Sequence, residues 1–295
     1  MAPAPWKVSL HGGHSGEFCE HAQGTLREIL DEAVRQGFAA CGVTEHAPRA
    51  EPRFLYASER QKGYTVARLE REFDRYAGES RRLQTEFEGR LDVLRGFETE
   101  VVPSGRYASL MRRIRDRYEF DYVVGSVHHV EEIPIDESPD LHRAAMDACG
   151  GLRPFLVKYY GLVREMIEEL RPEVVGHLDL PKLHLPPGAD LPDGQVRAAA
   201  ERAIEAARSN GCILDLNTAG WRKGLAAPYP SPRLVQLARE AGVPFCFGDD
   251  SHSRSHVGFG IARAREYLLA NGVDSVTVLE RQDGETARRE VPLQT

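Results

Sequence analysis

Short apolar runs alternate with amphipathic stretches from one end of the chain to the other. The apolar runs are typical of buried strands, and the amphipathic stretches repeat with the period of an α-helix. This alternation indicates an α/β protein with a largely parallel sheet. The sequence predicts seven strands, at residues 6–10, 38–43, 91–97, 120–127, 173–176, 211–217 and 243–248.

The clearest helix is predicted over residues 25–36. Thr25 and Glu28 form a T-x-x-E capping box, an apolar stripe follows, and Gly37 is placed to end the helix. Six more helices are predicted, at residues 65–88, 104–118, 154–170, 193–209, 232–241 and 258–270. Because no repeat, low-complexity tract or linker divides the chain, we expect residues 1–295 to form one domain.

The amino-acid composition excludes several classes of protein. Of the 295 residues, 41% are hydrophobic and 28% are charged. This is enough apolar material for a buried core, and it excludes disordered, collagen-like and coiled-coil proteins. The five cysteines are scattered without a C-x-x-C pair, so reduced thiols are expected rather than a disulfide framework or a zinc ribbon.

The net charge restricts the possible partners. With 38 Lys and Arg against 45 Asp and Glu, the net charge is −7, the wrong sign for general electrostatic binding to nucleic acid. An anionic substrate therefore needs a local positive centre. The N-terminus lacks a signal-type apolar segment, and no stretch of about 18 apolar residues occurs. We expect a cytoplasmic protein with neither nucleic acid nor a membrane as its partner.

Ligand-type side chains follow most of the predicted strands. They are His11, Glu45 and His46, Glu98, His128 and His129, His177, Asn217, and Asp249, Asp250 and His252, with His14 and His21 in the first loop. In a barrel of parallel strands these ends meet at one face, where barrel enzymes place their chemistry. A single histidine is more often packed or solvated than a ligand, but so many at one face predict a metal site.

The types and the number of these candidate ligands indicate which metal ions the predicted site would bind and how many. Imidazoles with a few carboxylates suit zinc, iron(II) or manganese, whereas calcium or magnesium prefers oxygen ligands. Nine candidate ligands are too many for one ion and predict two or three divalent metal ions. Closely spaced ions of this kind serve hydrolytic phosphate chemistry.

In order along the chain, these residues form seven motifs: His11-x-x-His14, His21, Thr44-Glu45-His46, Gly96-Phe97-Glu98, Gly125-Ser126-Val127-His128-His129, Gly176-His177-Leu178-Asp179-Leu180-Pro181-Lys182 and Gly248-Asp249-Asp250-Ser251-His252. This set resembles the polymerase-and-histidinol-phosphatase (PHP) superfamily. The GSVHH, GHLDLPK and LNTAG segments are most similar to its monofunctional histidinol-phosphatases. The resemblance implies a distorted, TIM-like (β/α)7 barrel with a trinuclear metal site.

The resemblance also implies which residues bind each ion. The first ion would be held by His11, His14, Glu98 and Asp250, the second by His21, His46 and His252, and the third by Glu98, His128 and His177. Glu98 would bridge two ions.

Two positions depart from the family pattern. The family usually begins with Asp-x-His-x-His, whereas here an extra residue separates His11 from His14. The pair Gly12 and Gly13 could form a bulge that returns both rings to one ion, because glycine tolerates the backbone angles required. Glu45 stands where many relatives have Asp, next to a ligand rather than as a ligand.

Other residues near the motifs are candidates for substrate binding. Arg49, Arg53, Lys182, Arg222 and Lys223 could meet a phosphate, and among these Lys182 and Arg222 are favoured; the alternative for each is an ordinary surface charge. Asn217 either contacts substrate or forms a turn with its own backbone. Asp250 or His129 could handle the proton of the leaving group, and the alternative for His129 is simple packing.

These observations predict a metal-dependent phosphomonoesterase that acts on L-histidinol phosphate, a small-molecule substrate, and releases L-histidinol and phosphate. One alternative is the same chemistry on another phosphomonoester or on a nucleotide, because a fold and its metals do not fix specificity. The other alternative is a metal-binding barrel without catalytic activity. The oligomeric state and the metal identity are left open.

Overall fold

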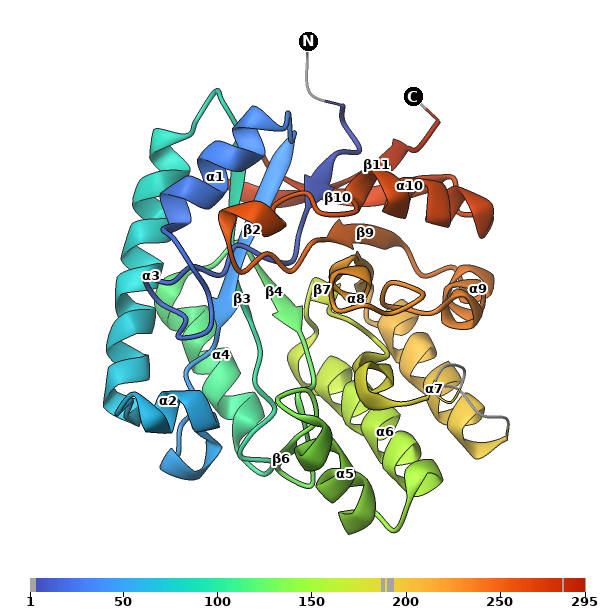
Figure 1. The fold of residues 1–295 in the computed structure, drawn as a ribbon. Coiled ribbons are helices and arrows are strands. Elements are labelled where there is room, and N and C mark those ends of the chain that lie inside the picture. Colours follow the sequence, from blue (N-terminus) through green and yellow to red (C-terminus); the bar gives the residue numbers. More distant parts are fainter. Residues whose placement is uncertain (1–3, 187–188, 190–193, 283, 295) are drawn as a thin grey trace.

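A parallel barrel forms the centre of the protein, as Figure 1 shows for the computed structural model, which describes residues 4–186, 189, 194–282 and 284–294. Its seven strands are parallel neighbours in the order β1-β2-β3-β4-β7-β8-β9. They are β1 (Val8–Ser9), β2 (Ala40–His46), β3 (Asp92–Glu98), β4 (Tyr122–Gly125), β7 (Val174–Val175), β8 (Ile213–Asn217) and β9 (Phe245–Gly248). Each predicted strand overlaps one of them. The backbone N–H of Leu10 donates to the carbonyl of Phe247 at 2.8 Å and joins the first strand to the last.

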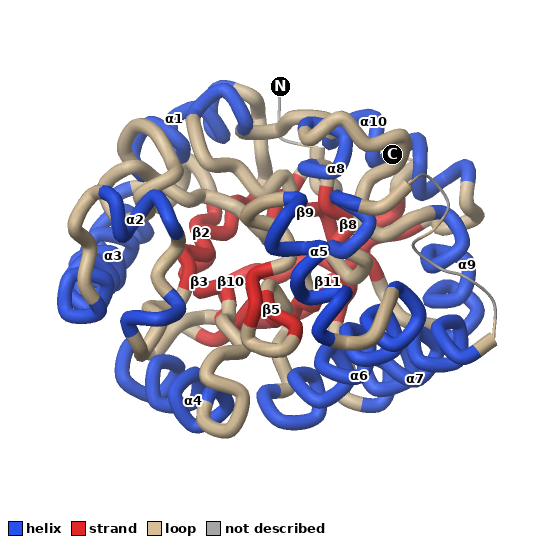
Figure 2. Tube along the Cα trace, turned by 60° about the horizontal axis from the view of Figure 1, so that its bottom comes forward, coloured by secondary structure: helices blue, strands red, loops and turns tan. Residues whose placement is uncertain are grey.

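Helices surround this barrel, as the tube in Figure 2 shows. The seven that the sequence predicts are present as α1 (Leu26–Arg35), α3 (Val66–Glu86), α4 (Tyr107–Tyr118), α6 (Leu152–Leu170), α7 (Gln195–Ser209), α9 (Pro232–Ala241) and α10 (Ile261–Ala270). The capping box of α1 is confirmed, because the Thr25 side chain accepts from the N–H of Glu28 and the Glu28 carboxylate accepts from the N–H of Thr25. The predicted α/β barrel is therefore confirmed. No helix in the described part of the chain is both long enough and apolar enough to span a membrane.

Several short elements were not predicted. They are the helices α2 (Ala57–Gln61), α5 (Pro139–Ala148) and α8 (Ala219–Arg222), three 3₁₀ turns at Pro52–Phe54, Leu180–His184 and Arg254–His256, and the hairpins β5–β6 (His129–Val130, Ile133–Pro134) and β10–β11 (Ser275–Gln282, Glu285–Pro292). Two of them have a recognisable signal. Ser138 caps α5 and Pro139 occupies its first turn, and an Asp-Gly pair separates the two strands of the second hairpin.

The barrel interior is packed around a tyrosine. Tyr122 is fully buried, and its hydroxyl donates to the carbonyl of Leu10 at 2.7 Å. Gly42 on β2 and Gly96 on β3 leave room for the Tyr122 side chain. A Cβ on Gly42 would overlap the Tyr122 hydroxyl, and a Cβ on Gly96 would lie 2.9 Å from the Tyr122 ring. The Tyr122 side chain therefore requires glycine at positions 42 and 96.

A buried arginine fastens α2 to the barrel. Arg49, 4% exposed, follows β2 and forms ion pairs with Glu59 on α2 and, at 3.2 Å, with Glu100 after β3. Its guanidinium also lies over the Tyr56 ring, 4.2 Å from the centroid. Because α2 forms one wall of the cavity described below, Arg49 supports the shape of that cavity.

We expect Gly42→Ala to lower the free energy of unfolding by about 1–3 kcal/mol, because its methyl group would overlap the Tyr122 hydroxyl. Tyr122→Phe removes that oxygen together with one hydrogen bond, a loss of about 1 kcal/mol. The double variant should therefore be less destabilised than the sum of the two single variants, as urea unfolding would measure. Strict additivity would contradict the proposed overlap.

We expect Arg49→Ala to lower the free energy of unfolding by about 3–5 kcal/mol, because it leaves two buried carboxylates uncompensated. Arg53→Ala is the control: Arg53 pairs with Glu51 and Glu132 at the surface, where ion pairs contribute little. Urea or thermal unfolding of both variants would check this. Equal melting temperatures for the two variants would contradict the structural role of Arg49.

Candidate metal centre

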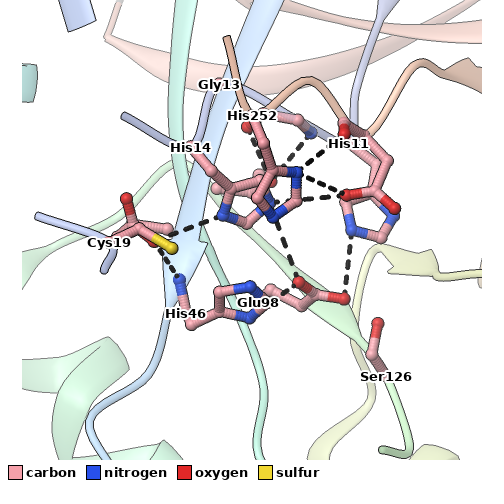
Figure 3. Close-up of polar contacts among 12 residues, drawn as sticks. His11, Gly13, His14, Cys19, His46, Glu98, Ser126 and His252 are labelled. Atoms are coloured by element: carbon pink, nitrogen blue, oxygen red, sulfur yellow. Dashed lines mark hydrogen bonds and ion pairs between the residues drawn. The ribbon is translucent and has the colours of Figure 1, made fainter. Parts of the chain in front are cut away.

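A cavity of about 780 Å³ opens at the carboxyl ends of the barrel strands. It is bordered by His21, His46, Tyr56, Glu98, His128, Asp136, His177, Arg222, Lys223, Asp250, His252 and His256, among others. Six of them end or closely follow barrel strands, because the carboxyl ends of parallel strands meet at one face: His46, Glu98, His128, His177, Asp250 and His252. Figure 3 shows several of their side chains gathered around Glu98.

Glu98, at the end of β3, is the centre of this group and is 1% exposed. His11 Nε2 and His177 Nε2 each lie 3.1 Å from its Oε1, and His128 Nε2 lies 3.3 Å from the same atom. His46 Nδ1 lies 3.1 Å from its Oε2. Burial alone would raise the pKa of Glu98, but the neighbouring histidine charges hold it well below its usual range. A carboxylate kept ionised at this depth requires positive charge beside it.

The surrounding donor atoms fall into overlapping groups whose members all lie within 4.8 Å of one another. The groups are His11, His14 and Glu98; Glu98, His128 and His177; Cys19, His21, His46 and His252; His14, Asp250 and His252; and His14, Glu45 and His46. All nine residues predicted as metal ligands are in these groups. Cys19 and Glu45 are additional members.

The donor atoms themselves fit divalent ions. Nε2 of His11, Nε2 of His14 and Nδ1 of His46 are buried and make no hydrogen bond with good angles. His128 Nε2 and His177 Nε2 face each other at 3.3 Å, beside the same oxygen of Glu98. Imidazole and carboxylate donors that converge in this way suit zinc, manganese or iron.

The protonation state of His21 and His252 is compatible with metal binding. Burial and the nearby charge of His46 lower the pKa of His21 to about 4, and burial with the charge of His14 lowers the pKa of His252 well below its usual value. Both rings are therefore neutral near pH 7. A neutral imidazole is the form that binds a metal ion.

A second layer of carboxylates orients the rings. Asp215 Oδ2 lies 2.7 Å from His11 Nδ1, and Glu45 Oε1 lies 3.2 Å from His14 Nδ1. Such partners fix the tautomer and direction of a ligating histidine. Asp215 was not among the residues that the sequence predicted for the site. Its signal was its position two residues before Asn217 on β8, which places both side chains on one face of the strand.

The first loop accommodates its extra residue with glycine. Gly12 and Gly13 have φ values of +150° and +76°, which L residues rarely adopt. A Cβ on Gly12 would lie 2.5 Å from Asp249 Oδ1. In this conformation Nε2 of His11 and of His14 both face Glu98, at 3.1 and 3.8 Å from its oxygens.

The last motif contains a strained backbone. Asp250 has a φ of +49°, and its N–H donates to the carbonyl of His11 at 2.8 Å. The Arg222 guanidinium donates to the carbonyls of Asp249 and Asp250, both at 2.7 Å. Arg222 therefore holds this turn in place while it borders the cavity.

Three of the basic residues predicted to meet phosphate are engaged elsewhere. The Lys182 ammonium donates to Asp179 and to the carbonyl of Pro228, and it lies over the Tyr229 ring. Arg49 is buried between two glutamates, and Arg53 pairs with glutamates at the surface. None of the three is among the residues that border the cavity. Their contacts thus support structural roles, whereas Arg222 and Lys223 do border it.

Asn217 and His129 also have contacts that favour the structural alternatives. Asn217 is buried, and its side chain accepts from the N–H of Ala219 at 2.9 Å, which is a contact of the turn after β8. It also donates to Asp215 at 3.1 Å and so supports the carboxylate that contacts His11. His129 packs edge-on against Phe54, away from the cavity lining. Burial lowers the pKa of His129 to about 4, so near pH 7 this ring is neutral rather than the imidazolium form that a general acid needs.

Comparison with known proteins agrees with this geometry. The PHP domain family model matches residues 11–219. The chain is 36% identical to a Schizosaccharomyces pombe protein named probable histidinol-phosphatase, over 93% of this chain and 90% of that protein. It is 35% identical to a protein of the same name from Deinococcus radiodurans, over 90% of this chain and 94% of that protein.

A solved structure has the same fold. It is the histidinol phosphate phosphatase of Lactococcus lactis, crystallised with zinc, L-histidinol and phosphate, and it superposes with a TM-score of 0.68 at 18% identity, over 96% of this chain and 99% of that one. Because the family model covers most of the chain and the relatives align over nearly their whole length, the chain belongs to the PHP domain family and, within it, to the histidinol-phosphatases.

Proposed function

We infer that this protein hydrolyses L-histidinol phosphate to L-histidinol and inorganic phosphate. The observation that carries this conclusion is the buried cluster of histidines and carboxylates around Glu98, which opens into a cavity at the carboxyl ends of the strands. The relatives that are 35–36% identical along their length have the histidinol-phosphatase name. A cavity of about 780 Å³ is within the usual range for small-molecule sites.

The cluster would hold two or three divalent ions. The first would be bound by His11, His14, Glu98 and Asp250, the second by His21, His46 and His252, and the third by Glu98, His128 and His177. The structure groups His11 and His14 with Glu98, groups Asp250 with His14 and His252, and adds Cys19 to the second set. Such ions activate water and stabilise the oxygens of a phosphoryl group. Zinc is favoured because the Lactococcus lactis enzyme was crystallised with it, and manganese and iron suit the same donors.

Positive charge beside the cluster would bind the phosphate dianion. Arg222 and Lys223 both border the cavity, and the Lys223 ammonium forms no ion pair with any described residue. A lysine or arginine donates charge-assisted hydrogen bonds to phosphate oxygens. These two residues would therefore hold the phosphate in a protein whose net charge is −7.

Asp250 has two further functions in this proposal. Its backbone N–H and carbonyl tie the last motif to the first loop and to Arg222. Of the two residues considered for handling the leaving-group proton, only Asp250 borders the cavity. Burial alone would raise the pKa of Asp250, but the charges of His252 and His11 hold it well below its usual value, so this carboxylate could receive a proton but carries none to deliver near pH 7.

We expect the purified protein to release phosphate from L-histidinol phosphate in preference to glycerol phosphate, phosphoserine and nucleoside monophosphates. Removal of metal by a chelator should lower the rate by about a hundredfold or more, and zinc or manganese should restore it, because the bound ions would supply the activated water that attacks phosphorus. A phosphate-release assay measures both. Full activity of metal-free protein would exclude the mechanism, and a faster reaction with another ester would identify a different substrate.

We expect Glu98→Gln to lower the metal content by more than one equivalent, because two groups of donors share this carboxylate. His46→Ala should remove mainly one ion. Elemental analysis of both variants, with circular dichroism to confirm folding, would measure the difference. Equal losses from the two substitutions would contradict a bridging role for Glu98.

A further inference from the structure

One carboxylate at the cavity is not engaged by the protein. Asp136 lies between β6 and α5, in the segment that Figures 1 and 2 place across the mouth of the barrel. It borders the same cavity as the metal cluster. Asp136 is half-buried, and its buried Oδ1 has no hydrogen-bond partner among the residues that the structure describes. The rings on which its charge acts include His129 and His142, but neither forms an ion pair with it.

The other carboxylates of the cavity have partners. Glu98 and Asp250 belong to the groups of metal donors, and Glu137 accepts from the N–H of Ala57 at 2.7 Å, which connects α5 to α2. Asp136 is therefore the uncommitted anion among the described residues that border the cavity.

A buried carboxylate oxygen without a donor is unfavourable, so a hydrogen-bond donor that enters the cavity beside Asp136 would be stabilised there. A further metal ion is a poor candidate, because no described group of potential ligands includes Asp136. An organic ammonium fits better, since it provides one positive charge and three donors.

We propose that Asp136 binds the primary ammonium group of the substrate and selects phosphate esters that contain one. This inference rests on the proposed function, because L-histidinol phosphate has an amine on the carbon next to its phosphorylated CH₂OH group. The cavity then offers complementary charges. Arg222, Lys223 and the ions that the donor groups would hold bind the phosphate, and Asp136 binds the ammonium.

Asp136→Asn tests the proposal, because it keeps the shape of the side chain and removes its charge. We expect kcat/KM for L-histidinol phosphate to fall about ten- to a hundredfold, chiefly through KM. The comparison substrate is 3-(imidazol-4-yl)propyl phosphate, which lacks only the amine. Its kcat/KM should differ by less than about twofold between wild type and variant, and should already be low in the wild type.

The assay is done at pH 7.5, about one unit above the ordinary pKa of imidazole, so that the amine is the main cation of the substrate. Calorimetric titration with L-histidinol gives a readout independent of turnover, and its affinity should fall by a similar factor in the variant. Asp140→Asn is the matched control: Asp140 is an exposed acid in the first turn of α5, four residues after Asp136, and is absent from the cavity lining. Its kinetics should match the wild type.

The outcomes of these experiments distinguish failure of the ammonium site from failure of the proposed function. If wild type hydrolyses L-histidinol phosphate and Asp136→Asn lowers kcat/KM equally for both substrates, the ammonium site is wrong and the proposed function stands. Wild type that does not discriminate between the two esters also overturns the site. If wild type does not hydrolyse L-histidinol phosphate at all, the proposed function fails and the inference fails with it.

Discussion

A carboxylate buried in the barrel and kept ionised sets the main constraint on this structure. Glu98 is 1% exposed, and four imidazole nitrogens from four different segments lie 3.1–3.3 Å from its oxygens. An isolated charge at this depth would be strongly unfavourable, so the strand ends must deliver compensating groups with little freedom. The second layer of carboxylates, including Asp215 and Glu45, then fixes the histidine rings. Catalytic geometry and folding therefore depend on the same contacts.

The barrel and the inner donor groups could be predicted because their signals are local and repeated. Each strand is a short apolar run, each major helix is amphipathic, and a ligand-type residue follows most strands. Parallel topology then brings these residues to one face without any knowledge of side-chain positions. The β5–β6 hairpin was missed because its strands are only two residues long. The β10–β11 hairpin and α5 are as long as elements that were predicted, and they were missed although Ser138-Pro139 begins the helix with a recognisable cap.

The functions of the charged residues could not be predicted in the same way, because they depend on partners distant in the sequence. Lys182 follows a strand-end motif, yet its ammonium contacts Asp179 and Pro228. Arg49 differs from a surface arginine only because Glu59 and Glu100 meet it in the fold. Cys19 has no motif of its own, and its place beside His21 and His252 results from the path of the first loop. Pairing of this kind is a property of tertiary structure.

The seam of the barrel, where β1 meets β9, affects how the metal cluster forms as the chain folds. The N–H of Leu10 joins β1 to β9, and the N–H of Asp250 donates to the carbonyl of His11, so both sides of the seam contribute donors to the same cluster. Residues made early and late in synthesis must therefore meet before this cluster exists. An ion held by His14, Asp250 and His252 would connect both sides of the seam, and by mass action it would stabilise the closed barrel. The supply of metal would then help to determine how much of the chain stays folded.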